Sequence, residues 1–278
     1  MFDLMYHVPT TTDHGDEGLL RHAECEVHAL LEVGRVYGCS DVVSLHIDNV
    51  LNIYRETILD ECRNKPVSML EVAVRYQCDW IFREAGLHLL GRSNKRWDLA
   101  QDRLKELGIQ ELFTAKREEF VSKLKAADHD LLSMSVRYER STVTGEQAVA
   151  EMELPLAFFR SWLSPKICNA GKQGHRLHPG YAEVYHRLVR GREFLPGYNE
   201  IGEYLRKSHG LESGYGPSVA FVADLQMGVD AVFKVAADRV KHLTKVETAA
   251  KYPDETSVLS RGLTCMEISD DELPWGKE

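Results

Sequence analysis

The sequence predicts a mostly α-helical protein, an irregular helical bundle built from antiparallel helix pairs with at most a short strand or extended connector. Apolar residues recur every three or four positions along most of the 278 residues, which is the spacing of helices with one buried face. The pattern L-E-V-x-x-x-Y-x-C also occurs twice, at residues 31–39 and 70–78. Each copy lies where one predicted helix ends and another begins. We therefore expect two helix-turn-helix corners within one compact unit.

The first half of the chain carries the expected helix pairs. Gly38 and Gly91 each follow a periodic stretch and can end a helix. Ser40 can cap a helix, and Pro66 suits an early helical position. Helices are predicted over residues 19–37, 41–54, 67–76, 79–90, 97–108 and 111–126.

The second half predicts further helices and a polar tail. Alternating apolar and polar residues at 131–138 mark a connector, which is the place for a short strand. An aromatic helix is expected to end near Pro165, and the longest helix carries an unbroken apolar stripe. The predicted helices cover residues 148–167, 181–189, 201–207 and 218–246. The predicted divisions are an N-terminal helical unit at 1–127 with tandem helix pairs at 28–91, a connector at 128–150, a C-terminal helical unit at 151–260 and an acidic tail at 261–278.

Composition and charge disfavour several classes of protein. A net charge of −9 and a pI near 5.8 argue against nucleic acid or an anionic membrane surface as the main partner. No apolar run reaches the roughly 20 residues of a membrane-spanning helix, and the N-terminus lacks the pattern of a signal peptide. The six cysteines are dispersed without C-x-x-C spacing, so we expect reduced thiols. We expect an intracellular protein, in the cytoplasm or nucleus, that binds neither nucleic acid nor membrane.

One cluster in the second half is the best candidate for chemistry. Cysteine and histidine can hold zinc, and histidine, tyrosine and glutamate can transfer protons. The cluster lacks the C-x₂₋₄-C and H-x₃₋₅-H spacings of zinc sites, so a polar loop explains its residues as well. We therefore expect no metal and no cofactor. The cluster comprises Cys168, His175, His178 and His186, with Tyr181, Glu183 and Tyr185 between them.

The acidic tail contains a lone tryptophan, Trp275. Its large apolar ring is costly to leave in water, so it either docks on its own domain or anchors a partner. Docking is the interpretation that we favour, because a terminal segment is ordered only when it is tied down. The residues predicted to contact a partner are Leu273, Pro274 and Trp275.

Four motifs lie within one stretch of the first half: R-V-Y-G-C at 35–39, H-I-D at 46–48, W-I-F-R-E-A at 80–85 and L-H-L-L-G at 87–91. The stretch 30–92 that contains them resembles the helical region that follows the BTB/POZ domain in a group of fungal BTB proteins. The opening F-D-L-M-Y-H-V-P at 2–9 is similar to the end of the BTB domain itself. L-T-C at 263–265 and D-D-E-L-P-W at 270–275 resemble the acidic ends of these proteins.

This resemblance implies an interaction protein without catalysis. In the wider BTB class, the BTB domain mediates dimerisation and docking on cullin-type ubiquitin ligases, and the attached helices orient the part that recognises the substrate. The residues at 1–9 look like an amphipathic helix already under way without an N-cap, so we expect the sequence to be a segment of something longer. The core of the BTB domain is missing before Met1, and the sequence leaves open whether it was lost in evolution. Cullin docking and BTB-type dimerisation are not carried over.

We therefore predict a non-catalytic adaptor or scaffold that binds other proteins, and we leave open whether it is a homo-oligomer. The alternative is an enzyme or small-molecule binder with a pocket between the two predicted helical units, lined by His175, His178, Tyr181 and Tyr185. A third interpretation is a histidine/cysteine metal protein.

Overall fold

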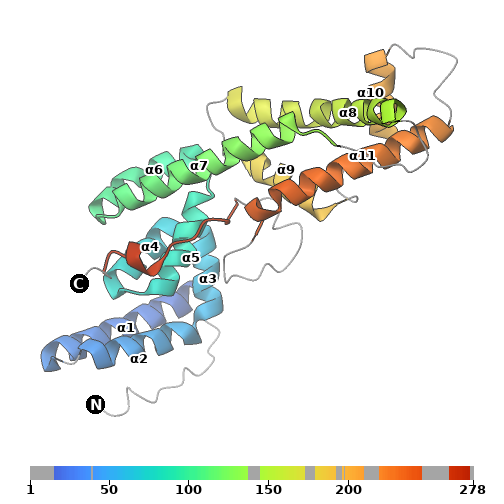
Figure 1. Ribbon diagram of the computed structural model, residues 1–278. Helices are drawn as coiled ribbons and strands as arrows, with labels where there is room; N and C mark the ends of the chain where they lie inside the picture. The colour runs from blue at the N-terminus through green and yellow to red at the C-terminus, as the bar shows by residue number, and fades with distance from the viewer. Residues whose placement is uncertain are drawn as a thin grey trace. The chain divides into compact units, whose positions relative to one another are not determined.

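The computed structural model describes residues 16–38, 40–136, 145–172, 179–191, 196, 198–209, 219–245 and 263–275 (Figure 1). These residues form helices and the turns between them, and no strand occurs in this part of the chain. The prediction of a mostly α-helical fold is therefore confirmed. In the described ranges, no helix is both long enough and apolar enough to cross a membrane.

The chain divides into two compact units. Unit 1 runs up to Gly86 and also includes the chain from Leu273 onward, whereas unit 2 comprises Leu87–Glu272. The boundaries predicted at residues 127 and 151 differ from this division. Helix α7 (Gln110–Ser133) passes through the first of them without a break.

Unit 1 begins with two helices that pack against each other, α1 (Asp16–Tyr37) and α2 (Ser40–Ile53) (Figure 1). Gly34 faces Val43 at the contact, and a Cβ at Gly34 would lie only 3.0 Å from Cγ2 of Val43. Glycine thus permits the close approach of α1 and α2. The remaining helices of this unit are α3 (Arg55–Asn64), α4 (Pro66–Tyr76) and the first part of α5 (Asp79–Leu90). The core includes Ile58, Cys62, Leu70, Ala73, Ile81 and Phe82, all 0% exposed.

Both copies of the repeated pattern end a helix, as predicted. Gly38 has a φ of +64° and Gln77 a φ of 51°, the left-handed conformation that stops an α-helix. After Gln77, the backbone N–H of Cys78 donates to the oxygen of Ala73 at 3.0 Å and so satisfies a carbonyl at the end of α4. Cys78 is buried, which agrees with a packing role, whereas Cys39 lies outside the described residues.

The cysteines whose state is described carry free thiols. Cys62 and Cys78 are buried, Cys25 is exposed and Cys265 is partly exposed. Burial raises the pKa of the Cys62 thiol well above its usual value, and the nearby Glu84 adds to this. A buried thiol with a raised pKa is a packing residue rather than a nucleophile.

Unit 2 is built around α11 (Val219–Val240), which packs against several other helices of the unit (Figure 1). Phe233 of α11 meets Phe159 and Trp162 edge-on, with 5.0 Å between ring centroids in both pairs. The elements of this unit are the end of α5, α6 (Asn94–Glu106), α7 (Gln110–Ser133), α8 (Gly145–Lys172), α9 (Pro179–Arg190), α10 (Tyr198–His209), α11, and the short 3₁₀ helices η3 (Lys241–Leu243) and η4 (Asp270–Glu272).

Two helices extend beyond their predicted ends. Helix α7 continues to Ser133 because Leu124, Ala127 and Leu131 keep helical spacing and are all buried, so the predicted connector starts too early. Helix α8 continues past Pro165 to Lys172. Packing of an apolar face contributes most of the stability of a helix within a protein, and the buried Leu163 lies two residues before this proline.

Candidate functional site

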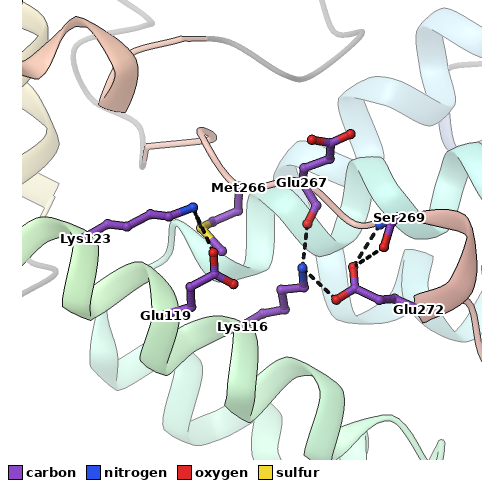
Figure 2. A network of polar contacts seen from close by, with 7 residues as sticks. All are labelled: Lys116, Glu119, Lys123, Met266, Glu267, Ser269 and Glu272. Carbon is purple, nitrogen blue, oxygen red and sulfur yellow. Dashed lines mark hydrogen bonds and ion pairs between the residues drawn. The ribbon is translucent and has the colours of Figure 1, made fainter.

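The C-terminal strap, which we define as residues 263–272, packs on α7 within unit 2 (Figure 2). Its first six residues have no regular secondary structure. Met266 and Ile268 are 2% and 3% exposed, whereas Glu267 between them faces solvent. The strap therefore contributes apolar side chains to the core and leaves polar groups at the surface. Its other buried residues are Leu263 and Thr264.

Lys116 of α7 is the main polar anchor of the strap (Figure 2). Its Nζ donates to the backbone oxygen of Glu267 at 2.9 Å and pairs with Oε1 of Glu272 at 2.7 Å. The side chain of Lys116 is only 15% exposed, so water screens the ion pair less than it screens a pair at the open surface. Two helical turns further along, Nζ of Lys123 lies 3.8 Å from Sδ of Met266 and 2.8 Å from Oε1 of Glu119.

The carboxylate of Glu272 reaches back to Ser269 at the start of η4, as in one half of a capping box, and we call this pair the capping box (Figure 2). The backbone N–H and the hydroxyl of Ser269 both donate to Oε2 of Glu272, each at 2.9 Å. Burial alone would raise the pKa of Glu272, but the hydrogen bonds from Lys116 and Ser269 outweigh it, and the net pKa is below the ordinary value. Glu272 is therefore ionised at neutral pH. This site was not predicted from the sequence, although the S-x-x-E spacing at 269–272 is its signal.

The three residues predicted to contact a partner belong to unit 1. Leu273 is buried, Pro274 is exposed and Trp275 is partly buried. The indole Nε1 of Trp275 donates to Oδ1 of Asp79 at 2.8 Å, and its ring meets Phe82 edge-on with 5.3 Å between centroids. Trp275 thus docks on α5 of its own chain, which is the favoured interpretation from the sequence. Partner binding by these residues stays a prediction.

Tyr181 and Tyr185 lie one turn apart on α9 and share the carboxylate of Asp128 on α7. Tyr185 Oη donates to Oδ1 of Asp128 at 2.6 Å, Tyr181 Oη donates to Oδ2, and the two hydroxyl oxygens are 3.1 Å apart. Burial raises the pKa of Tyr185 far above its usual value, and Tyr181 and Asp128 raise it further. The Tyr185 phenol stays protonated at neutral pH, and the hydrogen bonds of this cluster tie α9 to α7.

The other residues of the sequence cluster are only partly described. His175 and His178 lie outside the described residues, and Cys168 lies in α8 without a described side chain. His186 is 8% exposed, and burial, aided by Arg190, lowers its pKa to about 4. Glu183 pairs with Arg187 on the same helix. Among the side chains that the structure describes, no group of three histidines, cysteines or carboxylates is placed to hold a metal ion.

An exposed apolar face lies near the end of α1 in unit 1. Val33, Val36 and Tyr37 are 37%, 72% and 64% exposed. Their i, i+3, i+4 spacing puts them on one side of the helix. Val27, which is 0% exposed, and Gly34 lie on the other side, where α1 packs on α2. The sequence predicts a corner within the core at this stretch, and the outward face of the helix was not predicted.

Comparison with known proteins returned no match to a family model, to a curated protein or to a solved structure. The resemblance to the region after a BTB domain therefore rests on the sequence motifs alone.

Proposed function

We propose that this chain is a non-catalytic protein-interaction scaffold of the BTB-associated type, and that the end of α1 is one of its contact surfaces. The observation that carries this proposal is the exposed apolar face formed by Val33, Val36 and Tyr37. Single exposed apolar side chains are common, but neighbouring ones on one helix face are typical of sites where another protein binds. The face also lies in the stretch that resembles the BTB-associated helices.

Burial of this face would contribute substantially to binding. Full burial of a large apolar side chain is worth about 1.5–3 kcal/mol relative to exposure. Val36 and Tyr37 are largely exposed, so a partner that covers them gains most of this free energy. Tyrosine also offers a hydroxyl for orientation, and aromatic side chains are enriched among the residues that dominate binding energy.

Two of the polar groups that burial perturbs have structural partners, as expected for a scaffold. The Tyr185 hydroxyl is engaged with Asp128, and the Arg117 guanidinium is engaged with backbone oxygens and Asn94. Each of these groups joins structural elements, which is a sufficient reason for its burial.

The proposal is tested with two double variants of equal charge change. Val36→Lys/Tyr37→Lys places cations on the apolar face near a helix C-terminus, where cations are tolerated. Ile53→Lys/Leu99→Lys is the control, because these side chains are 65% and 76% exposed elsewhere in the chain. Tagged wild type and both variants are used for affinity capture from native extract with quantitative mass spectrometry. Circular dichroism checks that all three fold.

We expect specific partners of the wild type to be retained by the control and reduced at least about tenfold by the α1 variant, equivalent to about 1.4 kcal/mol. Light scattering of the same three proteins shows whether the partner is a second copy of the chain. Identical capture and identical mass for all three proteins would contradict a contact surface on α1.

A further inference from the structure

We propose that Ser269 is a phosphorylation site for an acid-directed serine kinase, and that the phosphate opens the capping box at the end of the C-terminal strap. This inference concerns unit 2 and does not depend on the proposed contact surface of α1. It rests on the exposed hydroxyl of Ser269, on the carboxylates that follow it, and on its direct bond to the group that pairs with Lys116.

The sequence around Ser269 fits a kinase with a basic substrate cleft. Asp270, Asp271 and Glu272 follow it directly, and Ser269 and both aspartates are exposed. Kinases discriminate among substrates by such charge patterns, so three successive carboxylates select an enzyme with complementary cations. The residues before Ser269 are without regular secondary structure, and η4 after it is a single short turn. The segment can therefore adopt the extended form that a kinase cleft requires by local opening.

The reaction is an ordinary phosphoryl transfer with ATP as the donor. Oγ of Ser269 attacks the γ-phosphorus, an Oγ–P bond forms, and the bond from that phosphorus to the β–γ bridging oxygen breaks. The hydroxyl proton passes to the catalytic carboxylate of the kinase, and ADP leaves. No oxidation or reduction takes place.

The phosphate changes the contacts of Glu272. At pH 7 it adds a charge of about −1.5 to −2 and removes the hydroxyl proton. In the unmodified chain, Oγ of Ser269 donates to Oε2 of Glu272 at 2.9 Å. The phosphorylated Oγ has no proton to donate, and the negative charge of the phosphate repels the carboxylate. The single ammonium of Lys116 cannot neutralise both groups, and it also holds the oxygen of Glu267. With only three residues, η4 has almost no helix dipole to stabilise the phosphate.

The effect is confined to the end of the strap. Leu263 and Met266 are held by apolar burial, which a new charge at residue 269 leaves intact. Phosphorylation should therefore loosen residues 267–272 and leave residues 263–266 packed on α7.

The modification is tested on the full chain with ATP and a purified acid-directed serine kinase, followed by site mapping with mass spectrometry. We expect near-complete phosphorylation of Ser269 in the wild type and none at this position in Ser269→Ala. Asp270→Asn/Asp271→Asn keeps Glu272 and the capping box but should react at least tenfold more slowly. Glu111→Gln/Glu118→Gln, exposed on α7, has the same charge change and should react like the wild type. An unmodified Ser269 in the wild type, or equal rates for the two double variants, would overturn the assignment.

The structural consequence is measured by hydrogen exchange. Wild type treated with kinase and ATP is compared with wild type treated with kinase in the absence of ATP, so that the reference keeps the Ser269 hydroxyl. Exchange in residues 267–272 should rise about tenfold on phosphorylation, as expected for loss of one or two hydrogen bonds to a charged group, while exchange in 263–266 stays unchanged. Equal exchange in residues 267–272 of the two samples would show that the phosphate does not open the capping box.

Discussion

The guanidinium of Arg117 donates to the backbone oxygen of Arg92 at 2.8 Å, so that a side chain of α7 closes the end of α5. The same group donates to the backbone oxygen of Leu90 and to Oδ1 of Asn94, the latter at 3.0 Å. Its central carbon lies 5.0 Å from the centroid of the Trp97 ring. Burial lowers the pKa of Arg117 to about 10, which still leaves it charged at pH 7. One buried cation thus satisfies carbonyls that the end of α5 leaves unpaired.

Replacing this cation should be strongly destabilising. Arg117→Met keeps an apolar stem of similar length but leaves the oxygens of Leu90 and Arg92 without their donor. We expect the free energy of unfolding to fall by about 2–4 kcal/mol, measured by urea denaturation. Arg103→Met is the control, because Arg103 is half-exposed and pairs with the exposed Glu106 on the same helix. It should change stability by less than about 0.5 kcal/mol. Equal urea midpoints for the two variants would refute this role of Arg117.

Gln77 offers a stabilising substitution. Its φ of 51° is the left-handed conformation, in which a Cβ is unfavourable, and its side chain is exposed. Gly38 occupies the same place in the first copy of the repeat with a φ of +64°. Gln77→Gly should therefore raise the free energy of unfolding by about 0.5–1 kcal/mol. Gln77→Ala keeps the Cβ and should leave the midpoint of urea denaturation unchanged. A gain with alanine as large as with glycine would show that the backbone conformation is not the cause.

The local signals of the sequence predicted much of unit 1. The glycine at 38 and the proline at 66 mark helix boundaries through backbone chemistry alone, and α5 begins and ends at the predicted residues 79 and 90. The polar anchors of unit 2 were missed for a physical reason. Lys116 meets Glu272, and Asp128 meets Tyr185, across long stretches of chain. Such pairs depend on how helices pack, and no periodicity or cap encodes them.

Tyr185 should give the chain a distinct alkaline sensitivity. Its pKa is raised by burial in the folded state, so its contribution to stability is fully present below the unfolded value near 10 and is lost as the pH rises above it. Tyr185→Phe removes a hydrogen bond to Asp128 and should cost about 1–3 kcal/mol at pH 8. The difference between wild type and variant should shrink by about 1.4 kcal/mol per pH unit above 10.

Urea denaturation at pH 8, 10 and 11 measures this difference. Tyr37→Phe is the matched control, since that side chain is 64% exposed, and its curve should run parallel to that of the wild type. A constant gap between wild type and Tyr185→Phe over this range would mean that the Tyr185 phenol ionises alike in the folded and unfolded chain.

His186 should give the opposite sensitivity, toward acid. Burial and Arg190 lower its pKa to about 4 in the folded state, whereas the unfolded side chain titrates near 6.5. The unfolded chain therefore binds more protons, so stability is full above pH 6.5, falls by at most about 1.4 kcal/mol per pH unit below it and levels off below about pH 4. His186→Gln removes the pH-dependent contribution of this histidine to the free energy of unfolding. The change in stability at pH 7 does not affect this comparison of slopes. His28→Gln, on an exposed position of α1, is the control and should keep the wild-type slope. If the slope between pH 6.5 and 4.5 were the same in His186→Gln as in the wild type, His186 would titrate alike in the folded and unfolded chain, and the acid sensitivity would come from other histidines or from carboxylates.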